Sequence, residues 1–299
     1  MAMVRKYCMK KRIKLVLFFN HSRGVEVLKT LIKENYEIKK IFLSKKNLDK
    51  KILPFLKKNA LNYNIINNVN ESKIVSYIKK NNIDFNIIAG FPYIFKKDLL
   101  NSVNYATLNL HGGRLPKYKG ASTLNWQIIN GERKIGISII KANEKIDQGS
   151  ILGQSDFRLK ENHDISDVHR IANIKFAKLL SKVLIQFIRN KIIYSRNTGG
   201  KIYKQRNISD GLILWQKMNK EEVFNFVRAI TNPYPGAFSF LKNNNKKITI
   251  FKCKPYKCLL RYKPGFIFYK KNYFFVKCKK GCIKLLKFEG KINSGYSFK

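Results

Sequence analysis

Asn109–Gly120, with the sequence NLHGGRLPKYKG, is the stretch around which we expect the chain to be organised. The stretch begins inside a strand-like run, ATLNLH, in which Asn109 and His111 are two residues apart. Side chains two apart in a strand project from the same face, so Leu108 and Leu110 are predicted to take the opposite face. Glycines and a proline follow, and they indicate a loop with demanding backbone angles. The pattern predicts an amide and an imidazole side by side where a strand ends, as in an active site.

A second polar element follows downstream. Ile135–Lys141 (IGISIIK) is an apolar run of strand length. After it, Asp147 precedes a turn glycine and another predicted strand, Ser150–Phe157. We therefore expect a carboxylate in a turn between two strands, close enough to contact the amide and the imidazole.

Three motifs together resemble one family. Asn-x-His at Asn109, a Leu-Pro-x-Tyr-(Lys/Arg)-Gly loop from Leu115 and Asp-x-Gly at Asp147 are similar to the folate-dependent formyltransferases. These include the methionyl-tRNA formyltransferases and the N-formyltransferases that act on amino sugars attached to nucleotides. The later run RAITNPYPGAFSFL also resembles these enzymes, and the resemblance extends over Leu15–Leu286.

The sequence departs from the family's pattern at two places in the loop. Gly113-Arg114 stands where Ser-Leu is more frequent, and Lys119 stands where Arg is usual. Lysine keeps the charge but lacks the planar fork of a guanidinium, which weakens any bidentate phosphate contact assigned to this position.

The resemblance implies three catalytic residues and their roles. Asn109 would donate an N–H to the oxygen that becomes negative when a formyl group passes from N10 of a folate to a primary amine. His111 would take or relay the proton that the amine loses, and Asp147 would hold the imidazole in the right tautomer. The formyl donor implied is N10-formyltetrahydrofolate, and this chemistry requires no metal.

The resemblance also implies binding residues. The segment after the predicted strand Phe85–Ala89 would line the folate pocket, although from the residues alone it is equally an ordinary loop after a strand. The implied folate contacts are Gly90, Phe91, Pro92, Tyr93 and Asp147, and the implied substrate contacts are Arg114, Pro116, Lys117, Tyr118 and Lys119.

Two branches of the family differ in the acceptor. The tRNA-directed enzymes carry an insertion after the second strand that is rich in Arg, Gly and Pro, whereas here Leu43 is followed by SKKNLDKKILPFLKKN, which is basic but helical. The runs ASTLNWQIINGE and NPYPGAFSFL are more similar to the sugar-directed branch. We therefore predict a nucleotide-linked amino-deoxy sugar as acceptor, in the synthesis of a surface polysaccharide such as lipopolysaccharide O-antigen. The alternatives are initiator Met-tRNA, or a catalytically inactive basic binding protein on the same scaffold.

The charge balance is extreme, with 61 basic and 18 acidic residues and a formal net charge of +43. Such a surface attracts polyanions, including nucleic acid, and also nucleotide-linked and folate substrates. The excess is mostly lysine spread over nearly every segment with Asn and Ile, as compositional drift would leave it. Nonspecific polyanion binding and a homodimer both stay open as interactions of this chain.

The start of the chain, Met1–Arg12, is short and basic and runs into KLVLFF. Polar residues interrupt after a few apolar ones, which argues against a signal peptide. No uninterrupted apolar run approaches the ~18 residues of a membrane span. The expectation is a cytoplasmic protein with no membrane partner.

Apolar periodicity predicts an α/β fold, a Rossmann-like, mostly parallel open sheet with flanking helices. The loop after the first strand, HSRG, is not a dinucleotide-binding fingerprint. Besides those given above, the predicted strands are Leu15–Phe19, Glu37–Leu43, Asn62–Ile66 and Ala106–His111, and the predicted helices begin at Gly24 or cover Leu48–Lys58, Glu71–Lys80, Ser122–Asn130 and Asp164–Arg189.

Composition predicts two domains joined by a linker: 1–189 as the catalytic domain, 190–209 as the linker, and 210–299 as a helix followed by a small β domain of the open-barrel type. Asn219 and Glu222 predict an Asn variant of the capping box at the second domain's helix. In the first domain, Ser122 or Thr123 is expected to cap a helix. Its Trp126 either stacks on the substrate or lies in the core, and we predict the core.

Five cysteines are expected to be free thiols packed among strands, because their count is odd and the protein is expected in the cytoplasm. Four of them have spacings that overlap loosely with structural zinc sites, but they lie in β-like runs without the tight knuckles that zinc requires. The five are Cys8, Cys253, Cys258, Cys278 and Cys282. The histidines His163 and His169 are expected to be exposed.

Overall fold

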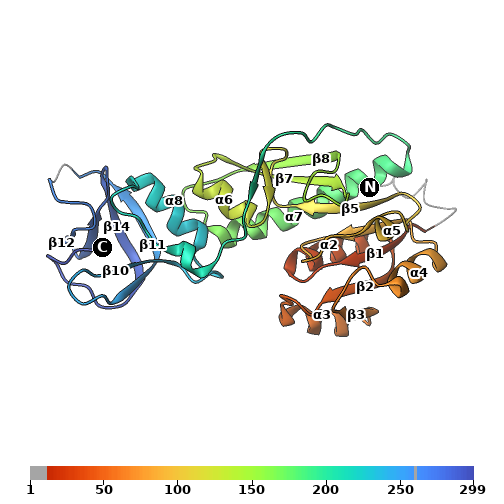
Figure 1. Cartoon of the computed structure of the whole chain (residues 1–299), viewed down its shortest axis with the longest axis horizontal. Coiled ribbons are helices and arrows are strands. Elements are labelled where there is room, and N and C mark those ends of the chain that lie inside the picture. Colours follow the sequence, from red (N-terminus) through yellow and green to blue (C-terminus); the bar gives the residue numbers. More distant parts are fainter. Residues whose placement is uncertain (1–11, 259–260) are drawn as a thin grey trace. The chain divides into compact units, whose positions relative to one another are not determined.

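A computed structural model describes residues 12–258 and 261–299 of the chain (Figure 1). The basic start of the sequence and Cys8 lie outside the described residues. Two compact units make up the fold: Met1–Gly120, Gly136–Asp156 and Arg170–Ile202 form the first, and Ala121–Ile135, Phe157–His169 and Tyr203–Lys299 form the second. The division into 1–189, 190–209 and 210–299 stays a prediction.

The first unit is built on a seven-stranded sheet with the order β3-β2-β1-β4-β5-β7-β8. Strands β1 to β5 pair in parallel, and β7 joins β5 in antiparallel register. The predicted mostly parallel α/β sheet is therefore confirmed. Its strands are β1 (Lys14–Phe18), β2 (Glu37–Ser44), β3 (Tyr63–Ile66), β4 (Phe85–Ile88), β5 (Ala106–His111), β7 (Lys134–Lys141) and β8 (Ile151–Arg158).

Helices connect these strands, as the apolar periodicity predicts. The inward face of α2 (Ser22–Lys33), for example, buries Val27, Leu28 and Leu31, while the strand β1 has Leu15–Phe18 fully buried. The sequence predicts one helix over Leu48–Lys58, but the structure has a 3-10 turn, η1 (Lys50–Ile52), followed by α3 (Leu53–Lys58). The other helices are α4 (Ser72–Lys80), α5 (Lys97–Leu100) and α7 (Ile165–Ile188), whereas α6 (Thr123–Ile129) belongs to the second unit.

The second unit contains the predicted helix and a five-stranded antiparallel sheet with the order β10-β11-β14-β13-β12. Helix α8 (Lys220–Ile230) has the capping box: Glu222 N–H donates to Asn219 Oδ1 at 2.9 Å, and Asn219 N–H donates to Glu222 Oε2 at 2.7 Å. The antiparallel β domain is thus confirmed. Its strands are β10 (Ala237–Phe240), β11 (Lys247–Tyr256), β12 (Ile267–Lys270), β13 (Tyr273–Lys277) and β14 (Cys282–Glu289).

Two short strands were not predicted. β6 (Tyr118–Gly120) lies in the glycine- and proline-containing loop, and it pairs with β9 (Lys201–Tyr203). A 3-10 turn, η2 (Ile208–Gly211), follows. The segment predicted as a linker therefore contains regular structure, because its backbone groups pair with a loop far away in the sequence.

Three local predictions around α6 and α7 are wrong. Ser122 has a left-handed backbone (φ 52°), and its hydroxyl accepts from Arg206 N–H at 3.3 Å instead of capping α6. Trp126 is half-buried and not in the core; its Nε1–H donates to the Lys204 carbonyl at 3.1 Å, and the Arg206 guanidinium lies over its ring. His163 and His169, which were predicted to be exposed, are also half-buried. His169 Nε2, for example, lies 3.0 Å from the Tyr234 hydroxyl.

The cysteine prediction is right for one pair and wrong for the other. Cys253 and Cys278 are buried free thiols, and burial raises the pKa of Cys278 to about 12. Cys258 and Cys282, however, form a disulfide. The antiparallel register places Tyr256 opposite Cys282, so the chain leaving β11 brings Cys258 beside it. The odd cysteine count carries no information about this register.

Candidate active site

Strand β5 delivers both residues of the Asn-x-His pair to one end of the sheet. Asn109 lies opposite Ile88 of β4, and His111 lies opposite Ser138 of β7. His111 is buried, whereas Asn109 is half-buried. Because β5 has neighbours on both sides, its backbone holds the two polar side chains on a rigid base.

Asp147 lies in the turn between β7 and β8 and faces the same place. Its Oδ1 accepts from Asn109 Nδ2 at 3.2 Å and lies 3.3 Å from His111 Nδ1. Its Oδ2 accepts from the Gly120 N–H at 2.8 Å. The structure therefore brings together the three residues that the sequence singles out, with the carboxylate bonded to both of the others.

The surroundings of Asp147 favour its ionised form. Burial by itself raises the pKa of this carboxyl group, but the hydrogen bond and the charge of His111 lower that pKa. The Gly120 N–H and the charge of Lys119 add to this, and the net result is a lowered pKa. At neutral pH the site holds a carboxylate against the imidazole.

Both ring nitrogens of His111 face hydrogen-bond acceptors. Nδ1 faces the Asp147 carboxylate, and Nε2 lies 2.6 Å from the carbonyl oxygen of Tyr118. A neutral imidazole has only one N–H, so the imidazolium is the form in which both contacts are hydrogen bonds. Nε2 can accept a proton only after it has lost its own and the Tyr118 carbonyl has moved away.

The loop between β5 and β6 is held tightly around this ring. A Cβ atom at Gly113 would lie 2.6 Å from His111 Nε2 and would also overlap the Tyr118 carbonyl. Ser138 Oγ donates to the Gly113 carbonyl at 2.7 Å and accepts from the Leu115 N–H at 3.1 Å. The glycine that departs from the family's usual serine thus leaves the space in which the imidazole and the carbonyl meet.

The predicted substrate-binding residues fall into two groups. Arg114 and Lys117 are exposed and Pro116 is half-buried; Arg114 Nη1 donates to Asp156 Oδ2 at 2.7 Å. Tyr118 and Lys119 are buried, with 1% and 4% of their surface exposed. Lys119 Nζ donates to the Asn197 carbonyl at 3.1 Å.

The predicted folate-binding segment follows β4, the strand beside Asn109. Gly90 has a positive φ of 79°, and Gly90–Tyr93 is half-buried. The ring of Phe91 packs edge-on against Phe18 and Phe95, and Tyr93 OH donates to the Asn67 carbonyl at 2.6 Å. Two half-exposed aromatic rings thus lie on a firm base at the strand end next to the polar trio.

Two residues at this site were missed by the sequence analysis. Arg23, in the HSRG segment, donates from Nη1 to the Leu110 carbonyl at 2.9 Å, between Asn109 and His111. Asn197 donates to the carbonyl oxygens of Asp147 and Gly149. Neither lies in a recognisable motif, and the only signal for Arg23 is its position just after the first strand.

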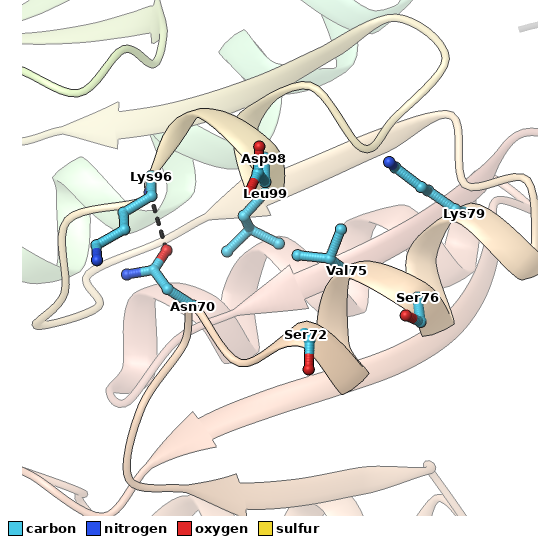
Figure 2. Close-up of a pocket in the computed structure, with 8 residues that line it drawn as sticks. All are labelled: Asn70, Ser72, Val75, Ser76, Lys79, Lys96, Asp98 and Leu99. Carbon is cyan, nitrogen blue, oxygen red and sulfur yellow. Dashed lines mark hydrogen bonds between the residues drawn. The ribbon is translucent and has the colours of Figure 1, made fainter.

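A hollow of about 420 Å³ lies elsewhere, between α4 and α5 (Figure 2). Its lining includes Asn70, Ser72, Lys79, Lys96 and Asp98, and no member of the trio. Asn70 accepts from the Lys96 N–H at 2.8 Å, so part of its polar surface is already paired. No hydrogen bond joins a nucleophile to a base among the described residues that line this hollow, so we place the chemistry at the trio.

Two observations concern metals and membranes. Over residues 12–258 and 261–299, His, Cys, Asp and Glu nowhere gather in groups of three or more that could hold a metal ion. In the same part of the chain, every helix is too short or too polar to cross a bilayer.

Comparison with known proteins agrees with this geometry. The family described as Formyl transferase matches residues 14–188, and the family described as Formyl transferase, C-terminal domain, matches residues 207–298. The bifunctional polymyxin resistance protein ArnA of Wigglesworthia glossinidia brevipalpis is 33% identical over 261 residues, an alignment that covers 81% of this chain and 38% of ArnA. The chain thus spans about two fifths of the length of that relative.

Solved structures share the fold. An N-formyltransferase from Helicobacter canadensis, in complex with folinic acid and dTDP-3-aminofucose, superposes with a TM-score of 0.71 at 20% identity over 93% of this chain and 100% of its own. A 4-N formyltransferase from Francisella tularensis gives a TM-score of 0.66 at 21% identity over 80% of this chain and 96% of its own. With both family matches in place over the same sheet and β domain, the chain belongs to the formyl transferase family.

Proposed function

We propose that this formyltransferase moves the formyl group of N10-formyltetrahydrofolate to the primary amine of a nucleotide-linked amino sugar. The observation that carries the proposal is the hydrogen-bonded trio of Asn109, His111 and Asp147 at the end of β5. An amide donor, an imidazole and a carboxylate are the groups that acyl transfer to an amine needs within reach of one carbon atom.

Each member of the trio has a role set by its contacts. Asn109 Nδ2 donates to the oxygen that gains negative charge, a contribution of ~3–4 kcal/mol for a well-placed donor. His111 relays the proton lost by the amine to the leaving nitrogen through Nε2, because Nδ1 is engaged with Asp147. This role requires the Tyr118 carbonyl, 2.6 Å from Nε2, to move away first. Asp147 holds the ring and stabilises its charged form.

The residues around the trio fit a folate. When bound, the folate supplies a formyl group on a nitrogen that can leave. The half-exposed rings of Phe91 and Tyr93 offer a flat apolar surface to a planar ring, and Gly90 lets the backbone approach closely. We assign Gly90–Tyr93 and Asp147 to the donor on this basis. The folinic acid complex of the Helicobacter canadensis enzyme, which has the same fold, supports the assignment.

The acceptor is proposed from three further points. Arg114 and Lys117 are exposed cations on the loop that ends at β6, and Pro116 lies between them, so the loop can meet a diphosphate. Buried Tyr118 and Lys119 instead hold that loop in place. The Helicobacter canadensis structure contains a dTDP-amino sugar, and ArnA is named for polymyxin resistance. The dTDP-amino sugar in that structure supports a sugar acceptor, and we propose a role in surface polysaccharide synthesis together with it.

Two other functions have some support. The net charge of +43 favours a nucleic-acid acceptor, and initiator Met-tRNA is the one that the family offers. A catalytically inactive binding protein would also use that charge, but an inactive scaffold has no need to retain a fully hydrogen-bonded trio. We therefore rank the sugar acceptor first.

The test is a formylation assay. The purified chain is incubated with 10-formyltetrahydrofolate and a panel of UDP- and dTDP-linked amino sugars, or with charged initiator tRNA, and products are identified by mass spectrometry. We expect donor consumption only with an amino sugar. Formylation of the tRNA and of none of the sugars would reassign the acceptor.

A matched pair of variants serves as control. His111→Gln should abolish formylation, whereas His163→Gln should retain it, because the ring of His163 accepts from the Lys160 N–H in the segment before α7. Equal activity of the two variants would remove His111 from the mechanism. Absence of formylation for every acceptor with folded wild-type protein would favour the inactive scaffold.

A further inference from the structure

Asn197 is a buried residue in an otherwise exposed segment. It has 8% of its surface exposed, whereas the residues on either side over 193–201 are all exposed. The segment approaches the sheet at Ser195, whose N–H donates to the Ile151 carbonyl at 2.9 Å. An amide turned inward from an exposed strap of chain needs a specific partner to offset its burial.

The partners are the two carbonyl groups of the Asp147 turn. Asn197 Nδ2 donates to the oxygens of Asp147 and Gly149, each at 2.8 Å. Both partners only accept hydrogen bonds, which fixes the orientation of the amide. Its Oδ1 is buried without a hydrogen-bond partner, which is unfavourable. The amide is therefore present for its N–H groups.

The backbone that these bonds hold is an unusual one. Asp147 has φ at 49°, in the left-handed region that residues with a Cβ rarely adopt. At Gly149 a Cβ atom would overlap the Lys141 carbonyl, so the turn is also packed tightly against β7. A turn of this kind keeps its shape only when its surroundings determine it.

Asn197 also reaches the other side of the site. Its main-chain carbonyl accepts from Lys119 Nζ at 3.1 Å, and Lys119 is buried. The next residue, Gly120, donates its N–H to Asp147 Oδ2 at 2.8 Å. One residue thus joins the turn that carries the carboxylate to the loop that binds the same carboxylate.

The exposed segment Ser195–Lys201, which we call the strap, also contacts the loop before Lys119. Lys201 N–H donates to the Lys117 carbonyl at 3.3 Å, and a Cβ atom at Gly200 would overlap the Pro116 carbonyl. The strap from Ser195 to Lys201 is therefore bonded at one end to the start of β8 and at the other to the substrate loop, with Asn197 between them.

We propose that Asn197 is a positioning residue for catalysis: it clamps the Asp147 turn against the loop of Lys119 and Gly120, and so holds the carboxylate on Asn109 and His111. The inference rests on the proposed function, because it assigns Asn197 to the same site. It gives the segment predicted as a linker a part in the chemistry.

Asn197→Asp and Asn197→Ala test the clamp, with Thr198→Ala as the matched control at the exposed neighbour. The Asp variant has the same shape but turns a carboxylate oxygen toward two carbonyl oxygens. We expect kcat for amine formylation to fall by about 10- to 100-fold in both, as for other residues that orient a catalytic group. KM for donor and acceptor should change little, and Thr198→Ala should behave as wild type.

A second measurement needs no activity. Hydrogen exchange followed by mass spectrometry should show faster exchange over residues 116–121 and 144–150 in both Asn197 variants, with β1 to β4 unchanged. If wild-type protein formylates no acceptor, the proposed function fails while exchange still decides the clamp. Unchanged exchange in both segments would overturn the inference. So would a loss of kcat that merely follows the folded fraction in thermal unfolding.

Discussion

Asp147→Asn separates the charge of the site from its shape. Asparagine has nearly the same volume as aspartate and tolerates the left-handed region better than most residues, so the turn at φ 49° should not be strained. The Asn oxygen can still accept from the Gly120 N–H, which places its NH2 group toward His111 Nδ1. That contact favours the tautomer with the proton on Nε2, where it donates to the Tyr118 carbonyl and cannot accept the proton of the amine.

The size of the effect follows from the distance between the carboxylate and the ring. Two unit charges 3.3 Å apart interact by about 5 kcal/mol at an effective dielectric constant of about 20. The Asp147 side chain is only 9% exposed, so solvent screening does not remove most of this interaction. If half to nearly all of it acts in the transition state, kcat/KM falls by about 10²- to 10⁴-fold, since about 1.36 kcal/mol is worth a factor of ten.

The assay is steady-state formylation of the amino sugar identified in the panel, with thermal unfolding measured in parallel. Asp98→Asn is the matched control, because it removes one exposed carboxylate on α5 and changes the net charge equally. We expect this control to retain wild-type kcat/KM. A folded Asp147→Asn protein with less than a tenfold loss would refute the reasoning, because the carboxylate would then not act on the imidazole in the transition state.

Four further outcomes are expected. Gly113→Ala should lower kcat by about tenfold or more in the formylation assay, because the added Cβ would lie 2.6 Å from His111 Nε2. Folding lowers the pKa of Asp147. The ionised carboxylate therefore contributes its full stability above the pKa of the unfolded chain, about 3.9, and this contribution is lost as the pH falls through the pKa of the folded protein. In urea titrations, the difference in unfolding free energy between wild type and Asp147→Asn should disappear at low pH. Alkylation in denaturant should modify Cys253 and Cys278 without reductant but Cys258 and Cys282 only after reduction, and full labelling of all four at once would exclude the disulfide. Binding of unrelated tRNA should fall by ~10³-fold or more between about 50 and 200 mM salt while sugar formylation weakens modestly, and tight, selective binding of initiator tRNA at the higher salt would favour the tRNA acceptor.

The elements of the first sheet could be predicted because their signals are local. The apolar run of β1 is fully buried, as its pattern predicts, and the i, i+2 spacing places Asn109 and His111 on one face of β5. The capping box at Asn219 is also local, since both of its bonds lie within four residues. Where one segment contains all the partners, the sequence is sufficient.

The parts that could not be predicted depend on distant partners. Asn197 meets Asp147 across 50 residues and Lys119 across 78, and nothing in the sequence around Asn197 indicates either contact. Ser122 has the residue type of a helix cap, but its hydroxyl is taken by Arg206, 84 residues away. The Cys258–Cys282 disulfide likewise follows from the register of β11 on β14. Local propensity fails at these places because a tertiary hydrogen bond or strand register decides the outcome.

The positions of the lysines separate the charge of the surface from the chemistry of the site. Lys119 is the only lysine that is buried among residues 12–258 and 261–299. Its charge contributes to the lowered pKa of Asp147. Exposed lysines act through water and are screened over about 8–10 Å at physiological salt, whereas the contact between His111 and Asp147 is shielded from solvent. The excess of +43 can therefore raise the local concentration of any polyanion without selecting the acceptor. Under the proposed function, selection falls to the loop whose Tyr118 carbonyl and Gly120 N–H contact the trio. We propose that its exposed cations, Arg114 and Lys117, meet the acceptor on a backbone held by Lys119 and Asn197.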